Sequence, residues 1–301
     1  MTSWRRTFVH VGGGRHHYLI GAYQQCSDAE RQPCGTFFAR YPSGGGVGDL
    51  TPFEGIRQGP GVFANSVAPA GDIGQLRTRL EAVLGRECAD AAEIPVAVSG
   101  GLDSWLLVAL LKSMGRAVRG WYLRTRIDGY CEFEQVARLG EALAVPVECV
   151  SASTADFRRA LPDFVNANQF PIYNAHPVSK LLLANAVARR GVNWLVTGDG
   201  ADQVMGHHWG CDLLPLTLTC FQHSGVRLVA PFLSDEVVGL CQRRYPNKEP
   251  VRELARQLGL PEIAKRPALF PERELPDCLG VTMRLLLVLL EVGEPCAASR
   301  V

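Results

Sequence analysis

The string Ser99-Gly-Gly-Leu-Asp-Ser104 carries the residues best suited to chemistry, between an apolar run at 94–98 and a strongly apolar stretch at 103–114. Glycines let the backbone approach an anion closely, and a helix that begins here adds free N–H groups and a positive dipole end. Asp103 does not favour phosphate directly, so its natural role is to hold Mg²⁺ that bridges phosphate oxygens. The alternative is a plain strand-to-helix turn in which Asp103 or Ser104 caps the helix. The residues expected to contact the nucleotide are Ser99, Gly100, Gly101, Leu102, Asp103 and Ser104.

A second glycine-rich loop follows another apolar strand, in the string LVTGDGADQVMGHHWG that runs from Leu195 to Gly210. Asp199 and Asp202 stand three residues apart in it, which suits work on a metal and a substrate. The alternative is an Asp-rich turn in which Asp202 caps a helix. Both glycine-rich loops follow apolar strands, so they are expected to open on the same edge of a parallel sheet, where ligands bind in such folds.

The string SGGLDS resembles the PP-loop signature of the N-type ATP pyrophosphatases, which cleave ATP between its α and β phosphates. This family includes asparagine, β-lactam, NAD and GMP synthetases and tRNA-thiolating enzymes. The string TGDGADQ is similar to the SGEGADE-type motif of the asparagine synthetase branch, VAPFLSDEVV at 229–238 to its R-x-P-F-L-D segment, and Lys248 to the lysine of its K-x-x-L-R segment. These matches, in order, span roughly residues 72 to 275.

The resemblance implies ATP and Mg²⁺ as cofactors. Asp103 and Asp202 match the metal-binding aspartates, and Asp199 matches a position near the acyl-adenylate. Adenine is expected near Leu123, and Gly198 and Gly200 are expected to contact the nucleotide.

Two departures from this family bear on the reaction. Thr2 stands where a glutamine-dependent synthetase has its cysteine, and about 70 residues precede the synthetase-like part, with GIRQGPGVF at 55–63 like the tail of a glutaminase domain. We therefore expect a reduced remnant without glutaminase activity. Ala268 stands at the position of the family's R-x-K lysine, so either Lys265 or Arg266 substitutes or the chemistry tolerates the loss. Losing one preorganised charge can cost on the order of 3 kcal/mol at a transition state, which favours a specialised biosynthetic role.

Cys131 lies in a loop just before a predicted helix, where a thiol becomes more nucleophilic. It is a candidate to deliver sulfur to an adenylated carbonyl, and the alternative is an inert, partly buried thiol. His207, His208 and Cys211 spell HHxxC. A zinc site needs about four ligands, and no fourth is signalled nearby, so a histidine acting as a base or a substrate contact is the better reading.

Strand-like and helix-like segments alternate from about residue 72 onwards, and the strands are continuously apolar. This pattern predicts a doubly wound parallel α/β sheet, and the resemblance implies the adenine nucleotide alpha hydrolase-like form of it. Expected strands cover 94–98, 116–123, 145–150, 191–197 and 226–230, and expected helices cover 73–84, 103–114, 132–143 and 176–190. Residues 1–70 form a small β-rich segment with strand-like pieces at 8–11, 18–23 and 36–40, and residues 71–301 form the synthetase-like domain.

The formal net charge is +1, which provides no strong basic field for nucleic acid. Ten cysteines without any CxxC pair suit a reducing cytosol, and no signal peptide is seen, so a cytoplasmic location is expected. The apolar stretch at 281–290 is too short to span a membrane and predicts a buried helix or a contact within a homodimer.

These observations predict an AMP-forming ligase that adenylates an oxygen of a small substrate with ATP and then transfers nitrogen from ammonia or an amine, forming an amide. The alternatives are sulfur transfer that gives a thioamide, and a catalytically dead nucleotide-binding subunit. The predicted catalytic residues are Asp199, Lys265, Arg266 and Cys131.

Overall fold

The computed structural model describes residues 8–10, 16–17, 29, 31–40, 52, 56–58, 73–205, 214–240, 248–260, 263 and 270–292. Its centre is a five-stranded parallel sheet with the strand order β6-β5-β4-β7-β8. The strands are β4 (Ile94–Ala97), β5 (Val118–Thr125), β6 (Val147–Ala152), β7 (Trp194–Val196) and β8 (Arg227–Val229). The predicted parallel α/β architecture is therefore confirmed, and all five predicted strands overlap an observed one.

The strand order reverses between β4 and β7, because the chain fills one half of the sheet outward from β4 and then returns to begin the other half at β7. In doubly wound sheets such a reversal leaves a crevice beyond the carboxyl ends of the two neighbouring strands. The loops that follow β4 and β7 are the two glycine-rich loops singled out above, and the topology therefore places both at this crevice.

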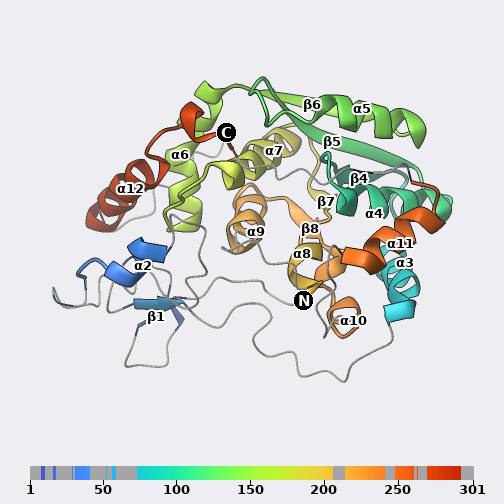
Figure 1. Cartoon of the computed structure of the whole chain (residues 1–301), viewed down its shortest axis with the longest axis horizontal. Coiled ribbons are helices and arrows are strands. Elements are labelled where there is room, and N and C mark those ends of the chain that lie inside the picture. Colours follow the sequence, from blue (N-terminus) through green and yellow to red (C-terminus); the bar gives the residue numbers. More distant parts are fainter. Residues whose placement is uncertain are drawn as a thin grey trace.

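Helices cover both faces of the sheet (Figure 1). Side chains alternate along each strand, so Leu195 of β7 belongs to one buried cluster while its neighbour Val196 belongs to the other. One cluster includes residues of α6 (Thr154–Asn168), α7 (His176–Arg189), α9 (Leu214–His223) and α12 (Cys278–Val292). The other includes residues of α3 (Leu76–Glu87), α4 (Leu102–Ser113), α5 (Phe133–Ala142), α10 (Asp235–Val238) and α11 (Glu249–Gln257).

The N-terminal part contains a small antiparallel sheet of β1 (Phe8–His10), β2 (His16–His17) and β3 (Ile56–Gln58). The strand-like piece predicted at 36–40 is wrong, because Gly35–Arg40 forms the short helix α2. Phe37 of this helix is fully buried and packs edge-on against Phe170, so a tertiary contact decides the conformation here. The piece predicted at 18–23 lies outside the described residues.

Two helices show what the sequence patterns missed. Helix α6 was not predicted, although Ser153 and Asp156 form a reciprocal capping box at its start. Helix α12 agrees with the apolar stretch at 281–290, but its burial is one-sided, since Leu287, Val288 and Val292 are exposed. No helix in the described ranges is long and apolar enough to cross a bilayer.

Candidate active site

The loop after β4 is held by the first turn of the helix that follows it. The indole N–H of Trp105, a fully buried residue of α4, donates to the carbonyl oxygen of Ser99 at 2.6 Å. The backbone N–H of Gly101 donates to the Ser99 hydroxyl oxygen at 3.1 Å, and the Ser104 hydroxyl oxygen accepts from the Ser99 N–H at 3.3 Å. The loop therefore has a defined shape at the N-terminus of α4, where N–H groups and the helix dipole favour an anion.

The N–H of Gly100 in this loop already has an anionic partner. It donates to a carboxylate oxygen of Glu132 at 2.9 Å, and Glu132 is the residue just before α5. A Cβ atom on Gly100 would lie 2.7 Å from the Glu132 carboxyl carbon, so only glycine allows this approach. The Glu132 backbone is fixed in turn, because its N–H donates to the Tyr122 hydroxyl oxygen at 2.8 Å.

The two glycine-rich loops touch each other through Gly198. A Cβ atom at Gly198 would lie 2.7 Å from the backbone nitrogen of Ser104 and 3.0 Å from Cβ of Asp103. The next glycine, Gly200, has φ of +97° and presses against Leu233 of the PFL segment. These contacts bring together three motifs that are distant along the chain.

Lys248 joins the two aspartates predicted to bind metal. Its ammonium nitrogen lies 2.6 Å from a carboxylate oxygen of Asp103 and 2.6 Å from one of Asp202. Burial raises the pKa of the Asp103 carboxyl, Lys248 counteracts part of that effect, and the nearby Asp202 adds to it. Burial works against the charged form of Lys248, but the two carboxylates outweigh it and raise the pKa of the ammonium. Lys248 therefore remains positively charged between the two carboxylates.

The donor set at this point fits Mg²⁺. Within the described part of the chain, the second carboxylate oxygen of Asp103 is buried without a hydrogen-bond partner. A buried carboxylate oxygen without a donor is costly, and a hard cation would satisfy it. No group of three or more His, Cys, Asp or Glu side chains suited to a metal is gathered among the described residues, so the remaining ligands would come from phosphate oxygens and water.

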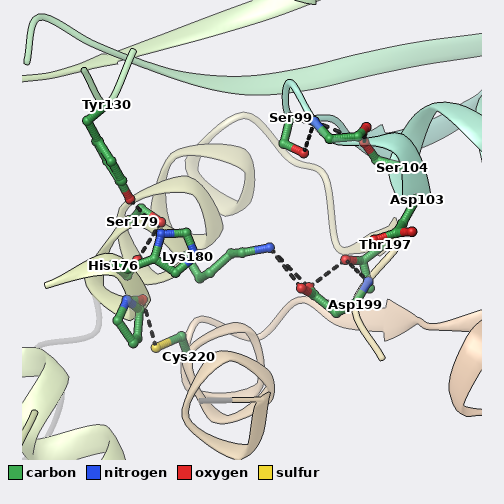
Figure 2. Close-up of polar contacts among 12 residues, drawn as sticks. Ser99, Asp103, Ser104, Tyr130, His176, Ser179, Lys180, Thr197, Asp199 and Cys220 are labelled. Carbon is green, nitrogen blue, oxygen red and sulfur yellow. Dashed lines mark hydrogen bonds and ion pairs between the residues drawn. The ribbon is translucent and has the colours of Figure 1, made fainter. Parts of the chain in front are cut away.

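Asp199 lies in the loop after β7 and points toward the end of the Lys180 side chain (Figure 2). Both of its carboxylate oxygens lie 3.1 Å from the ammonium nitrogen of Lys180, and one accepts from the Thr197 hydroxyl at 2.6 Å. Burial would raise the pKa of Asp199, but Lys180 and Thr197 outweigh it, and the pKa lies below its ordinary value. Asp199 therefore stays ionised and is a weak proton acceptor.

A histidine and a tyrosine continue this polar cluster along α7. The Tyr130 hydroxyl lies 2.9 Å from Nδ1 of His176, and the Ser179 hydroxyl donates to the His176 carbonyl oxygen at 2.6 Å. Burial lowers the pKa of His176 to about 4, and the charge of Lys180 adds to this effect. His176 is therefore neutral at physiological pH.

The remaining predicted residues fall in three groups. Leu123 is buried in the core next to β6, so its predicted contact with adenine stays a prediction. Cys131 is exposed, with its sulfur 3.9 Å from the Tyr122 hydroxyl, and it directly precedes Glu132. The others lie outside the described residues: Lys265, Arg266, Ala268, His207, His208 and Cys211.

Sequence reasoning did not select Glu132, His176 or Lys180 for the site. Lys180 had a usable signal, since it is the single charge in the largely apolar run VSKLLLANAVA. Glu132 follows the second strand, whose carboxyl end shares an edge with the loop after β4. The contact of His176 with Tyr130 joins residues 46 positions apart and has no local signal.

Comparison with known proteins gives one matching family model and two similar proteins. Residues 75–277 match the family model described as asparagine synthase. The tRNA-specific 2-thiouridylase MnmA of Thiobacillus denitrificans (strain ATCC 25259 / T1) is 29% identical over 195 residues, which cover 58% of this chain and 53% of that protein. The chain thus spans about half the length of this curated relative. A solved structure of the U34-tRNA thiolase NcsA from Methanococcus maripaludis, with its [4Fe-4S] cluster, is similar over 73% of this chain and 80% of that one, with 17% identity and a TM-score of 0.42.

Proposed function

The chain belongs to the asparagine synthase family of PP-loop ATP pyrophosphatases, and on that premise we propose that it adenylates an oxygen of a small substrate and then forms an amide. The observation that carries the proposal is the meeting of the loops after β4 and β7. Gly198 packs on the backbone of Asp103 and Ser104, and the carboxylates of Asp103 and Asp202 share one ammonium group. A triphosphate held at the N-terminus of α4 would lie beside both carboxylates.

The chemistry follows from the groups in place. The N-terminus of α4 would bind the β and γ phosphates of ATP, beside a loop whose Ser99, Gly100 and Gly101 N–H groups already donate to side-chain oxygens. Mg²⁺ held by Asp103 and Asp202 would neutralise charge on the phosphate oxygens. A carboxylate oxygen of the substrate attacks the α phosphorus, the bond from this phosphorus to the bridging oxygen breaks, and pyrophosphate leaves. N–H groups at the N-terminus of α4 would stabilise the charge that develops on the departing pyrophosphate.

The second step displaces AMP from the acyl-adenylate. An amine or ammonia attacks the acyl carbon, the bond from this carbon to the phosphate oxygen breaks, and the nitrogen loses a proton as the amide forms. Asp199 was expected to assist here, but its pairing with Lys180 and its lowered pKa make it a poor acceptor of that proton. Membership of the asparagine synthase family supports nitrogen as the nucleophile.

The test is isotope exchange between pyrophosphate and ATP, run with a panel of carboxylic acids, with the AMP formed measured in parallel. Magnesium-dependent exchange with one acid, and AMP release on addition of ammonia or an amine, would support the proposal. Formation of ADP in place of AMP would contradict it, because that product requires cleavage between the β and γ phosphates.

Sulfur transfer is the second candidate, and the position of Cys131 favours it. The exposed thiol is one residue from Glu132, whose carboxylate contacts the SGG loop. The curated relative that acts as a tRNA 2-thiouridylase also supports sulfur as the nucleophile. Cys131→Ser would then abolish product formation while exchange of pyrophosphate with ATP persists. Cys149→Ser, on the neighbouring strand β6, is the matched control. Unchanged turnover of Cys131→Ser would remove this candidate.

A further inference from the structure

We propose that Lys180 is a catalytic residue whose ammonium group contacts the α phosphate during adenylation, and that Asp199 is the residue that positions it. This inference rests on the proposed function and names the group that would act on the α phosphate. Lys180 and Asp199 form an ion pair that has no role in the reaction steps proposed above. Both partners are largely buried, with about a fifth of each side chain exposed.

Lys180 comes from helix α7, and its side chain reaches the loop after β7. Lys180 lies in the second turn of α7, and its extended side chain ends at Asp199, beyond the carboxyl end of β7 (Figure 2). Asp199 follows Gly198, which is packed against the start of α4. The ammonium group is therefore held by Asp199, one residue along the chain from the point where the loops after β4 and β7 touch.

The neighbours of Lys180 leave it as a hydrogen-bond donor. Its two hydrogen bonds within the described part of the chain go to the carboxylate of Asp199, and an ammonium group has three N–H donors. The groups beside this cluster are Thr197, which donates to Asp199, and the neutral pair of Tyr130 and His176, the latter on α7 itself. An anionic phosphate oxygen supplies the acceptor for the third donor.

Lys248, the other described lysine near these two loops, already has two carboxylate partners. Lys248 lies between Asp103 and Asp202, in the place suited to a metal and the terminal phosphates. Lys180 is held by a different aspartate of the loop after β7, Asp199. The two cations would thus serve different parts of the triphosphate.

The step requires no proton transfer from Lys180. The substrate oxygen forms a bond to the α phosphorus, the bond to the bridging oxygen breaks, and its electron pair leaves with pyrophosphate. Negative charge on the non-bridging α oxygens is then held by a donor that was oriented before the reaction. Asp199 keeps the lysine oriented but does not touch the reacting atoms.

The first test measures exchange of pyrophosphate with ATP in Lys180→Met. Removing one preorganised donor of this kind lowers the rate by about 10²–10³. We expect that loss in the maximal exchange rate, measured at saturating ATP. Lys180→Arg should retain more activity than Lys180→Met. Lys112→Met, which changes an exposed lysine of α4, is the matched control and should behave like the parent protein. A parent-like exchange rate in Lys180→Met would overturn the proposal.

The second test does not depend on turnover. Isothermal titration compares the affinities for AMP and adenosine, which differ by the α phosphate. The parent protein should bind AMP more tightly than adenosine, and the ratio of these two affinities should fall at least about tenfold in Lys180→Met. A double variant, Lys180→Met with Asp199→Asn, avoids leaving a buried carboxylate unpaired and should lose the same preference. Circular dichroism checks that both variants fold.

The outcomes separate the two proposals. An unchanged AMP preference in Lys180→Met, or no such preference in the parent protein, would overturn the role of Lys180. Absence of exchange with every acid, together with an AMP preference that depends on Lys180, would instead count against the adenylation reaction proposed above.

Discussion

The carboxylate of Glu132 lies 2.9 Å from the backbone nitrogen of Gly100 and accepts its N–H. This acidic group therefore occupies a donor in the loop where phosphate is expected to bind. A carboxylate and a phosphate oxygen satisfy such a donor in the same way. Binding of the triphosphate must either displace Glu132 or proceed beside a negative charge.

Replacing Glu132 with glutamine should strengthen nucleotide binding. The variant keeps a hydrogen-bond acceptor for Gly100 but removes the charge that repels phosphate. One removed repulsion across a few ångströms near a protein surface is worth about 1 kcal/mol or more, so the dissociation constant for ATP should fall about fivefold. Titration with a non-hydrolysable ATP analogue measures it. Glu134→Gln, in the exposed first turn of α5, should change the affinity little. Weaker binding in Glu132→Gln would show that the carboxylate supports the nucleotide site.

Neutralising either aspartate of the carboxylate pair should remove magnesium-dependent chemistry. We expect Asp103→Asn and Asp202→Asn to lower ATP-to-AMP turnover at least about 100-fold, since each removes an anionic ligand of the metal. Asp128→Asn, an exposed substitution in the loop after β5, serves as the control. Binding of Mn²⁺, followed by electron paramagnetic resonance with ATP present, should weaken in the two site variants alone. Full activity of either site variant would rule out its carboxylate as a metal ligand.

A methyl group at Gly198 should destabilise the junction of the two loops. The added Cβ would meet backbone atoms of α4 at 2.7 and 2.9 Å, and backbone cannot move aside cheaply. Overpacking of this kind costs about 1–3 kcal/mol, which urea unfolding of Gly198→Ala can measure. Gly35→Ala, where a Cβ would meet nothing within 4 Å, is the matched control and should lie within about 0.5 kcal/mol of the parent. Equal stabilities of the two variants would contradict the close contact.

The neutral state of His176 should make stability fall as the pH falls. The folded-state pKa is about 4, below the unfolded value of about 6.5, so between these values the unfolded chain binds a proton that the native protein does not. The contribution of neutral His176 to the free energy of unfolding is complete above pH 6.5 and is lost progressively toward pH 4. Its upper limit is about 3 kcal/mol. Urea unfolding at several pH values should show this slope in the parent and a smaller one in His176→Gln. Identical slopes in both proteins would assign the pH dependence to other groups.

The sequence predicts the parts of the fold that repeat locally. The continuously apolar run at 94–98 forms β4, whose side chains pack on both faces of the sheet, and the helix expected at 132–143 is observed as α5. Helix α2 has no such signal, because the burial of Phe37 against Phe170 depends on a residue 133 positions away. Patterns confined to a short window do not carry that information.

The same limit applies to the candidate site. Its loops were predicted because glycines and aspartates gather in short strings, whereas Lys180 and Glu132 were missed because their contacts cross between elements. Asp199 was predicted as a catalytic residue from its loop, but its ion pair with Lys180 of α7 and its lowered pKa make it a poor proton acceptor.

Lys248 gives the paired aspartates a counterion supplied by the polypeptide itself. The folded chain can therefore keep two carboxylates close together whether or not divalent ions are abundant in the surrounding solution. Entry of a divalent cation would replace the single positive charge of Lys248 with two, so the net positive charge beside the aspartates would rise by one. The displaced ammonium group of Lys248 would then be a hydrogen-bond donor beside the anion that arrived with the metal.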